Sequence, residues 1–198
     1  MRTNRMNLES LSVEAPAQSH GNAGRARVRS LLKAADGSVQ RFRSHWGQAA
    51  LLHLPAVELV ERALLRFGHV ATRLASNGRG SANQALLMLR AFRDMEIDFI
   101  TAGNGLAVIG RGLDARVRMN DASVSKHHAN LSWSQSGIFL SDLGSLNGTE
   151  LNGVPVNGPV KLEDGDQIAL GDANLVFVTS HTLFLQLESV RHSEHGAH

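Results

Sequence analysis

Apolar and polar residues alternate along the second half of the chain, from about residue 98 onward. A period of two is typical of β-strands with one buried face. Four Asn-Gly pairs and one Asp-Gly pair in this half favour tight turns, because these residues tolerate a positive φ. The clearest apolar runs are LAVI (106–109), ANLSW (129–133), GIFLS (137–141), QIAL (167–170) and NLVFV (174–178). Many short strands joined by glycine-rich turns predict a β-sandwich.

Between residues 47 and 97 the apolar residues recur at intervals of three and four, the period of an amphipathic helix. Pro55 favours the first turn of a helix, and the polar segment SNGRGS (76–81) separates two apolar ladders. The first ladder is Val57, Val60, Leu64, Phe67, Ala71 and Leu74, and the second is Ala85, Met88, Phe92, Met95 and Phe99. We therefore expect a two-helix region at 47–97, an αα-hairpin whose apolar stripes pack on the rest of the chain or on a second copy of it.

The two ends of the chain carry weaker patterns. Residues 1–24 are polar and aperiodic, which predicts a disordered tail. Residues 25–46 contain two short runs around Asp36-Gly37, which favour a basic β-hairpin. Residues 189–198 form a tail with His192, His195 and His198 at even spacing. A metal site needs a rigid scaffold, so we interpret these histidines as solvated and predict no metal and no cofactor.

Composition narrows the class of protein further. The sequence is 42% hydrophobic, which is enough to fill a core. It contains no cysteine, which excludes disulfides, thiolate nucleophiles and cysteine-bound zinc. The basic N-terminus is not followed by the apolar stretch of a signal peptide, and no apolar run is long enough to span a membrane. These observations predict a cytoplasmic protein with no membrane partner.

Charge is divided unevenly between the two halves. Residues 1–97 hold 14 Lys and Arg against 7 Asp and Glu, whereas residues 98–198 hold 6 against 11. The basic segment 25–46 raises the question of nucleic-acid binding, but it has little aromatic interleaving and no reading motif. A solvated basic face, or one docked on the acidic half, is the better interpretation. We therefore expect no nucleic-acid partner.

Several fragments of the β-rich half occur in an order and spacing that resemble the forkhead-associated (FHA) domain family. They are IGR (109–111), SVSKHHA (123–129), DLGSLNGT (142–149), LNG (151–153) and LEDGDQIALG (162–171). The resemblance covers about residues 98–180. It implies a mainly β fold, an FHA-type sandwich of two antiparallel sheets whose loops at one end bind phosphothreonine in an extended peptide. We place this domain at residues 98–188, preceded by the helical region and the basic N-terminal segment.

The residues at the matching positions suit phosphate recognition. A phosphate ester carries nearly two negative charges and three acceptor oxygens, so its receptor needs several converging donors. Arg111 offers a planar fork that can contact two oxygens at once, Ser125 a short hydroxyl donor, and Lys126 a point charge. The resemblance assigns the phosphate to these three residues.

Other positions match the family in supporting roles. Asn147 and Asn152 correspond to asparagines whose amides bind the peptide main chain, a task that suits a group that both donates and accepts hydrogen bonds. A structural role in the loops is expected for Gly110, His128, Asp142, Ser145, Gly148 and Thr149.

The sequence departs from the family pattern in two places. Leu146 stands where the family often has a polar residue, so one side-chain contact near the phosphate is expected to be missing. The family also has a strand about ten to fifteen residues before the run IDFIT, where this chain has the helix-like ALLMLRAFRDM. The hairpin at 25–43 and the alternating run HTLFLQLE (181–188) are the candidates to cover the exposed sheet edge.

Catalytic interpretations of the same residues are weaker. Ser125, His128 and Asp142 contain the residue types of a hydrolase triad, but the chain lacks a G-x-S-x-G elbow at the serine. The segment GRGLDA (110–115) fits a loose dinucleotide-binding pattern, but ARVRMN follows it with the alternation of a strand rather than a helix. We therefore predict that the chain is not an enzyme.

Two functional hypotheses remain. In the first, the chain is a signalling adaptor that is recruited to a protein phosphorylated on threonine by a Ser/Thr kinase, and the helical region mediates interaction or homodimerisation. In the alternative, the FHA fold serves phosphate-independent assembly as a scaffold protein. Titration with phosphorylated and unphosphorylated peptides separates the two hypotheses.

Overall fold

A computed structural model of the chain describes residues 24–34, 38–54, 89, 91–101 and 106–195. Its strands are β1 (Arg25–Arg27), β2 (Ala49–His53), β3 (Glu96–Ile100), β4 (Ala107–Gly110), β5 (Val117–Arg118), β6 (Ala129–Ser134), β7 (Gly137–Asp142), β8 (Thr149–Leu151), β9 (Val154–Pro155), β10 (Val160–Lys161), β11 (Gln167–Leu170) and β12 (Ala173–Thr179). Its helices are α1 (Val28–Ala34), α2 (Val39–Trp46) and α5 (Ser180–His195).

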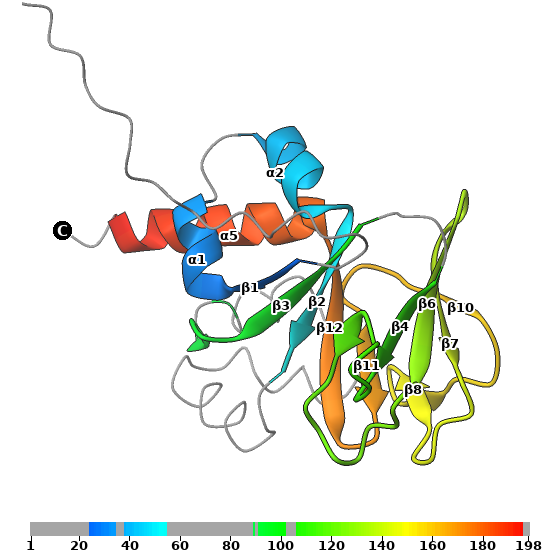
Figure 1. Cartoon of the computed structure of the whole chain (residues 1–198). Helices are drawn as coiled ribbons and strands as arrows, with labels where there is room; N and C mark the ends of the chain where they lie inside the picture. Colours follow the sequence, from blue (N-terminus) through cyan, green and yellow to red (C-terminus); the bar gives the residue numbers. More distant parts are fainter. Residues whose placement is uncertain (1–23, 35–37, 55–88, 90, 102–105, 196–198) are drawn as a thin grey trace, which may run out of the picture.

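The strands form two sheets that pack face to face (Figure 1). The larger sheet has the order β1-β3-β2-β12-β11-β8-β9, and the smaller has the order β10-β7-β6-β4-β5. Neighbouring strands pair antiparallel in every case except β4 and β5, which pair in parallel. The predicted mainly β sandwich is therefore confirmed, with one parallel pair at the edge of the smaller sheet.

The larger sheet is buried on both faces in its central part. In β2, Leu51 points into the core between the two sheets, whereas Leu52 points into a second core beneath the helices. In β12, Phe177 likewise points into the core between the sheets, and Val178 points into the core beneath the helices. Successive side chains of a strand point to opposite faces, so each of these strands needs apolar residues at every position. The molecule thus has three layers, consisting of the smaller sheet, the larger sheet and a layer of helices.

Residues 25–46 do not form the β-hairpin that the sequence suggested. They form β1, α1 and α2, and the apolar residues Val28, Leu31, Phe42 and Trp46 are buried against the larger sheet and α5. These residues recur at intervals of three or four within each helix, so a helix places them on one face. This segment was also predicted to cover an exposed sheet edge. Only β1 does so, because this short strand pairs with β3 at the edge of the larger sheet.

The strand that the sequence analysis missed is β2, which lies between β3 and β12 in the larger sheet. It falls inside the segment 47–97 that was predicted to be helical, so that prediction is wrong for residues 49–53 and 96–97. Phe99 belongs to β3 and not to the end of a helical ladder. The whole first ladder, and Ala85 and Met88 of the second, lie outside the described residues. Residues 54–95 therefore separate two strands that are direct neighbours in the sheet.

The run at 181–188 is also helical and does not cover a sheet edge. Together with part of the predicted tail at 189–198 it forms α5, so the last strand of the sandwich ends at Thr179. Leu183, Phe184, Leu187 and Val190 are buried, whereas Leu185 is half exposed. The exposed Leu185 is the residue that made this segment resemble an alternating strand.

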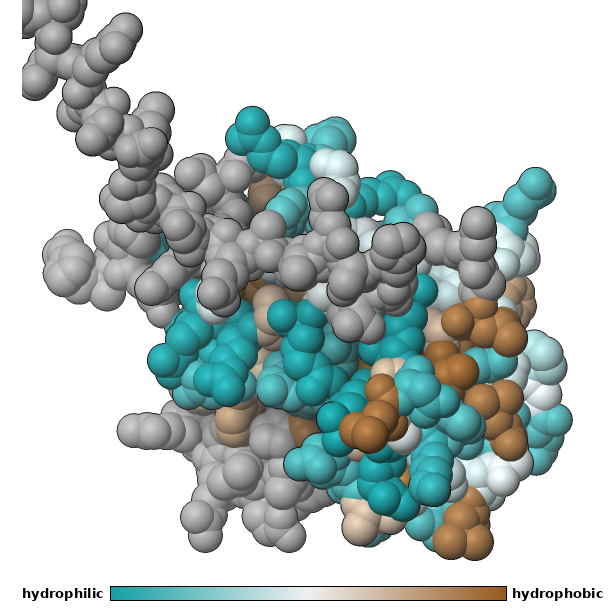
Figure 2. Space-filling model, viewed as in Figure 1, coloured by the Kyte–Doolittle hydropathy of each residue, from teal (hydrophilic) through white to brown (hydrophobic). Residues whose placement is uncertain are grey.

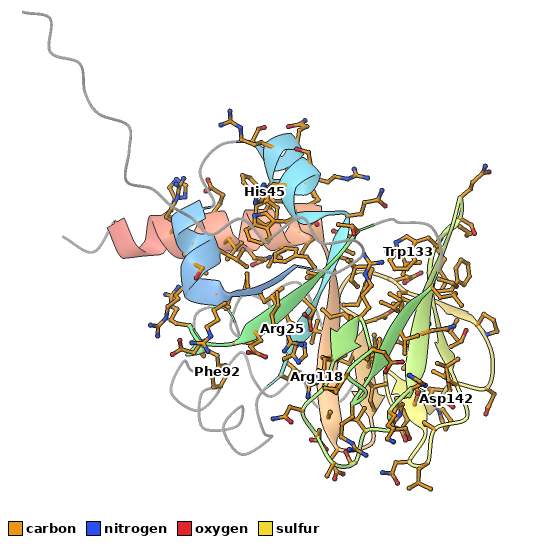
Figure 3. The ribbon with its side chains drawn as sticks, in the orientation of Figure 1. Arg25, His45, Phe92, Arg118, Trp133 and Asp142 are labelled. Atoms are coloured by element: carbon orange, nitrogen blue, oxygen red, sulfur yellow. The ribbon has the colours of Figure 1, made fainter. Side chains whose placement is uncertain are left out.

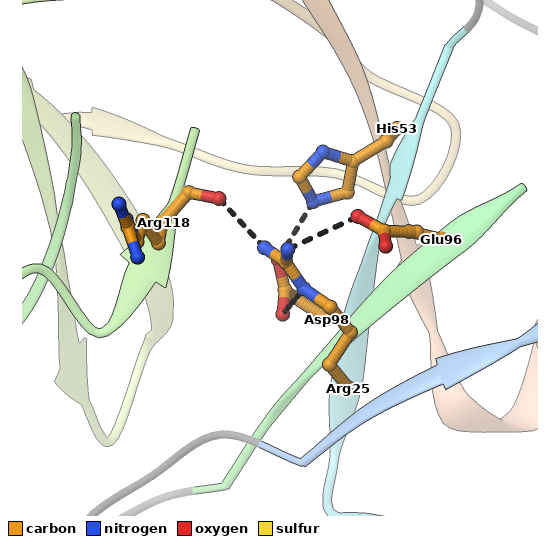
Figure 4. A network of polar contacts seen from close by, with 5 residues as sticks. All are labelled: Arg25, His53, Glu96, Asp98 and Arg118. Carbon is orange, nitrogen blue, oxygen red and sulfur yellow. Dashed lines mark hydrogen bonds and ion pairs between the residues drawn. The ribbon is translucent and has the colours of Figure 1, made fainter. Parts of the chain in front are cut away.

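A buried carboxylate connects the N-terminal segment to both sheets (Figure 4). The Asp98 side chain in β3 is only 3% exposed. It accepts hydrogen bonds from Arg25 Nε (2.9 Å) and Arg25 Nη2 (2.7 Å) and lies 2.6 Å from His53 Nε2. Arg25 also contacts the Glu96 carboxylate and donates to the carbonyl oxygen of Arg118 in the smaller sheet. One carboxylate thus joins β1, β2 and β3, and Arg25 extends the network to β5.

None of the helices in the described ranges is both long and apolar enough to cross a membrane.

Candidate functional site

Three loops at one end of the sandwich carry the three residues that the sequence assigns to phosphate binding and one of the two that it assigns to peptide binding. They follow β4, β5 and β7, and they lie together at the lower end of the sandwich in Figure 1. Figure 3 shows Asp142, at the end of β7, in this region and far from His45 on α2. The sandwich therefore separates this loop end from the helical layer, and the contacts described below hold the three loops together.

Arg111 is anchored to the loop that carries the other two phosphate donors. Its backbone N–H donates to Ser125 O (2.9 Å), and its Nε donates to Val124 O (3.2 Å). The Nε bond holds one edge of the guanidinium against the loop, and the residue as a whole is exposed. The two terminal nitrogens of a guanidinium can contact two oxygens of one phosphate.

Gly110 explains how the β4 loop can approach so closely. A Cβ atom at this position would lie 2.1 Å from Lys126 O, a distance that no side chain tolerates. Gly112 N donates to the same carbonyl at 2.9 Å. The glycine expected to be structural therefore allows the backbone beside Arg111 to contact the backbone of Ser125 and Lys126.

Ser125 is oriented by a neighbouring loop. Its Oγ accepts a hydrogen bond from Leu146 N at 3.1 Å, which leaves the hydroxyl hydrogen for another acceptor. Lys126 is exposed beside it. The structure thus brings Arg111, Ser125 and Lys126 together as donors on adjoining loops.

His128 is fully buried and connects these loops from beneath. Its Nδ1 accepts from Ser125 N (3.0 Å), and its Nε2 lies 2.9 Å from Gly148 O. A carbonyl oxygen only accepts, so the ring hydrogen is on Nε2. The Gly148 backbone has φ +77°, a conformation that glycine adopts without strain. Both ring nitrogens therefore bind backbone atoms, in agreement with the structural role expected of His128 and Gly148.

Asp142 organises the loop that follows β7. Its carboxylate accepts from Gly144 N (2.7 Å), Ser145 N (2.9 Å), Ser145 Oγ (2.7 Å) and Thr149 Oγ1 (2.5 Å). Burial by itself would raise the pKa of Asp142, but the hydrogen bonds from Thr149 and Ser145 outweigh burial and lower it. Asp142, Ser145 and Thr149 therefore form one structural unit, as the sequence suggested.

The two asparagines assigned to peptide binding lie in different places. Asn147 is exposed on the β7–β8 loop, and its Nδ2 donates to Ser123 O at 2.8 Å, beside the phosphate donors. Asn152 lies in the β8–β9 turn, where its amide donates to Asp166 Oδ1 (2.8 Å) and accepts from Gln167 N (2.9 Å). The structure thus adds Asn147 to the loop cluster, whereas the contacts of Asn152 fix a turn at the other end of β8.

Three polar contacts in the site were not anticipated from the sequence. His127 Nε2 lies 2.6 Å from Asp114 Oδ2, which joins the loop of Arg111 to the loop of Ser125, and this hydrogen bond lowers the pKa of the Asp114 carboxyl. Ser123 donates through Oγ to Asp121 Oδ1 (2.6 Å) and accepts from Asp172 N (2.9 Å). Residues 114 and 127 are far apart in sequence, so their pairing becomes visible only in the fold.

The residues of the hydrolase triad do not form one. His128 Nδ1 binds the backbone nitrogen of Ser125 rather than its hydroxyl. Asp142 binds Ser145, Thr149 and Gly144. A triad requires the serine hydroxyl on one imidazole nitrogen and the carboxylate on the other, and neither contact is made.

We expect His128→Ala to lower the free energy of unfolding by about 2 to 3 kcal/mol, because it leaves Ser125 N and Gly148 O without their partner and opens a cavity. Denaturant unfolding measures this loss. His127→Ala, on the same loop but half exposed, is the matched control and should change stability little. Unchanged stability of His128→Ala with loss of peptide binding would instead show that His128 contacts the ligand.

Comparisons with known proteins agree with the sequence fragments and the fold. The FHA domain pattern matches residues 107–171. FhaA of Mycobacterium tuberculosis is 42% identical over 72 residues, which covers 36% of this chain and 14% of FhaA. The oxoglutarate dehydrogenase inhibitor of Corynebacterium efficiens is 33% identical over 100 residues, covering 41% of this chain and 70% of that protein.

A crystal structure of the FhaA FHA domain, complexed with an intracellular domain, is 38% identical in sequence. It matches 39% of this chain and 85% of that domain, with a TM-score of 0.37. The chain spans only 14% of the length of FhaA and 43% of the glycogen accumulation regulator GarA of Mycobacterium tuberculosis. The similarity is therefore one of a domain, and on this sequence identity and coverage the chain belongs to the FHA domain family.

Proposed function

We propose that the chain is an adaptor that binds phosphothreonine peptides through the loops after β4, β5 and β7. The observation that carries the proposal is the convergence of Arg111, Ser125, Lys126 and Asn147 at one end of the sandwich. Backbone hydrogen bonds fix the loops before any ligand arrives, so little conformational entropy is lost on binding. Binding residues on loops of a rigid sandwich are a common arrangement.

The proposal includes an upstream Ser/Thr kinase, because the ligand must be phosphorylated on threonine. It also includes a cytoplasmic location and the absence of enzymatic activity. The engagement of both His128 nitrogens by backbone atoms supports a role in binding rather than catalysis. Among similar proteins, GarA is named a regulator of glycogen accumulation, and the Corynebacterium protein is named an inhibitor of oxoglutarate dehydrogenase. These names concern regulators, which supports an adaptor role.

Homodimerisation through the two-helix region remains a separate prediction. The described helices bury most of their apolar residues within the chain, against the outer face of the larger sheet, although Leu185 is half exposed. The first ladder, at 57–74, and the start of the second, at 85–88, lie outside the described residues, so homodimerisation through them stays a prediction. Sedimentation of the full chain decides this question independently of peptide binding.

Four versions of one peptide test the proposed function, with phosphothreonine, phosphoserine, aspartate or threonine at the central position. We expect the phosphothreonine peptide to bind and the aspartate and threonine peptides to bind at least about a hundredfold more weakly. A carboxylate has one charge and two oxygens, whereas the site provides donors for three oxygens of a doubly charged group. Phosphoserine should bind more weakly than phosphothreonine, because the family resemblance implies a small pocket for the threonine methyl group.

Calorimetry at fixed pH and salt measures all four affinities. If the aspartate and phosphothreonine peptides bind equally well, the loops recognise negative charge in general. If the threonine peptide binds as well as its phosphorylated form, the alternative of a phosphate-independent scaffold is correct.

A further inference from the structure

Two leucines stand out on the loops that carry the phosphate donors. The Leu146 residue is 89% exposed and the Leu113 residue 84% exposed, more than any other large apolar residue in the described part of the chain. Leu113 lies two positions after Arg111, and Leu146 directly precedes Asn147. Figure 2 shows apolar atoms at the surface of the sandwich on the side of these loops. A large aliphatic side chain in water gains free energy when something covers it.

Both leucines are held outward by anchored backbone. Leu146 N donates to Ser125 Oγ, and its neighbours Ser145 and Asn147 bind Asp142 and Ser123 through their side chains. These contacts fix the turn, so Leu146 cannot fold inward without breaking them.

Leu113 is held in the same manner by a different loop. Gly112 N donates to Lys126 O, and Ala115 N donates to Gly112 O at 3.2 Å. On the other side of Leu113, the carboxylate of Asp114 binds His127. Each leucine is therefore presented by a fixed loop beside a phosphate donor.

The proposed phosphopeptide is the occupant that the geometry favours for this surface. A peptide whose phosphate contacts Arg111 and Ser125 comes close to Leu146, because the Leu146 backbone itself binds the Ser125 hydroxyl. It also comes close to the loop of Leu113, which lies two residues after Arg111. An extended peptide advances about 3.3 Å per residue, so its nearest side chains reach the loop residues flanking the donors. Leu146 stands where a polar residue is common in the family, which replaces a polar contact with an apolar one.

We propose that this domain selects phosphothreonine peptides that carry an aliphatic side chain close to the phosphothreonine, at a position where Leu113 or Leu146 covers it. This inference rests on the proposed function and adds the class of sequence that the site prefers. The phosphate donors provide attachment, and the two leucines provide discrimination among phosphorylated sequences, since apolar contact does not distinguish phosphothreonine from threonine.

A leucine scan on a synthetic peptide tests the inference. The parent peptide has phosphothreonine in a background of alanine and serine, and single leucines replace each of the three positions before and after it. We expect leucine at one or two of these positions to tighten binding about tenfold. In Leu146→Ser or Leu113→Ser the gain over the parent peptide, measured on the same variant, should fall to about twofold.

Leu106→Ser provides the matched control. Leu106 is 61% exposed but lies at the opposite end of β4 from Arg111, so its replacement should leave the leucine preference intact. Equal affinity for all phosphorylated peptides, or a preference unchanged in both loop variants, would overturn the inference and leave the proposed function standing. Failure of every phosphorylated peptide to bind would instead reject the proposed function. A fall in sedimenting mass of Leu146→Ser would assign the leucines to self-association and also overturn the inference.

Discussion

Arg111→Ala is expected to weaken binding of a phosphothreonine peptide about a hundredfold without changing the stability of the domain. A hydrogen bond to a charged group contributes about 1.5 to 3 kcal/mol, and a bidentate contact belongs at the upper end of that range. Arg111 is exposed and its guanidinium makes a single hydrogen bond to a backbone carbonyl, so its removal leaves the core untouched. Calorimetric titration and denaturant unfolding measure the two quantities.

Two further variants make this prediction specific. Arg111→Lys keeps the charge but loses the planar fork, so its affinity should fall between those of the parent and the alanine variant. Arg118→Ala removes an exposed arginine on β5, close in sequence but outside the loop cluster, and should change binding little at moderate salt. If Arg111→Ala binds as tightly as the parent, the assignment of the phosphate site is wrong.

Asp98→Ala is expected to lower the free energy of unfolding by about 3 kcal/mol. Removing one member of a buried ion network typically costs about 3 to 5 kcal/mol, and we place this one at the lower end because Arg25 retains access to water. The loss should loosen the junction of β1, β2 and β3 rather than the phosphate loops. The matched control is Asp94→Ala, which removes an exposed carboxylate paired with an exposed arginine and should have little effect.

The same carboxylate predicts a dependence of stability on pH. Burial alone would raise the pKa of Asp98, but hydrogen bonds from His53 and Arg25 outweigh burial and lower it. A lowered pKa in the folded state contributes stability above the ordinary aspartate pKa of about 3.9, and this contribution is lost as pH falls through the lower folded value. The stability difference between the parent and Asp98→Asn should therefore be constant near neutral pH and shrink below about pH 4. A difference that does not change with pH would show that the charge of Asp98 is not what stabilises the network.

The network around Asp98 lies beside a cavity that residues near the candidate phosphate site also line. Residues 54–95 leave β2 next to His53 and enter β3 next to Glu96, both of which line a cavity of about 440 Å³ with Asp121 and Asp172. Asp121 and Asp172 also bind Ser123, whose carbonyl accepts from Asn147. The ends of β2 and β3 at His53 and Glu96 therefore lie across this cavity from residues that contact the loops of the candidate phosphate site.

Much of the candidate site could be predicted from the sequence because its determinants are local. Asp142, Ser145 and Thr149 lie within one short segment and contact one another, and Gly110 directly precedes the arginine that it allows to approach the neighbouring loop. Short strands separated by Asn-Gly turns likewise express their structure in their own residues. The role of Asn152 was not predictable in this way, because its partners Asp166 and Gln167 come from another turn.

The sequence by itself determined the β-sandwich and the loop residues that make up the candidate phosphate site, whereas the tertiary structure decided the described part of the N-terminal half and the C-terminal helix. The apolar run of β2 is buried on both faces, so it has no alternation to distinguish it from a helix, and residues 54–95 separate it from β3, its partner in the sheet. In α5, the exposed Leu185 gives the segment the alternating pattern of a strand. Its helical structure is decided by packing on α1, α2 and the larger sheet. The pattern of apolar residues specifies a helix or a strand when only one of its faces is buried and the elements that pack against it are near in sequence. Where both faces are buried or the partner is distant, the packing of the whole chain makes the choice.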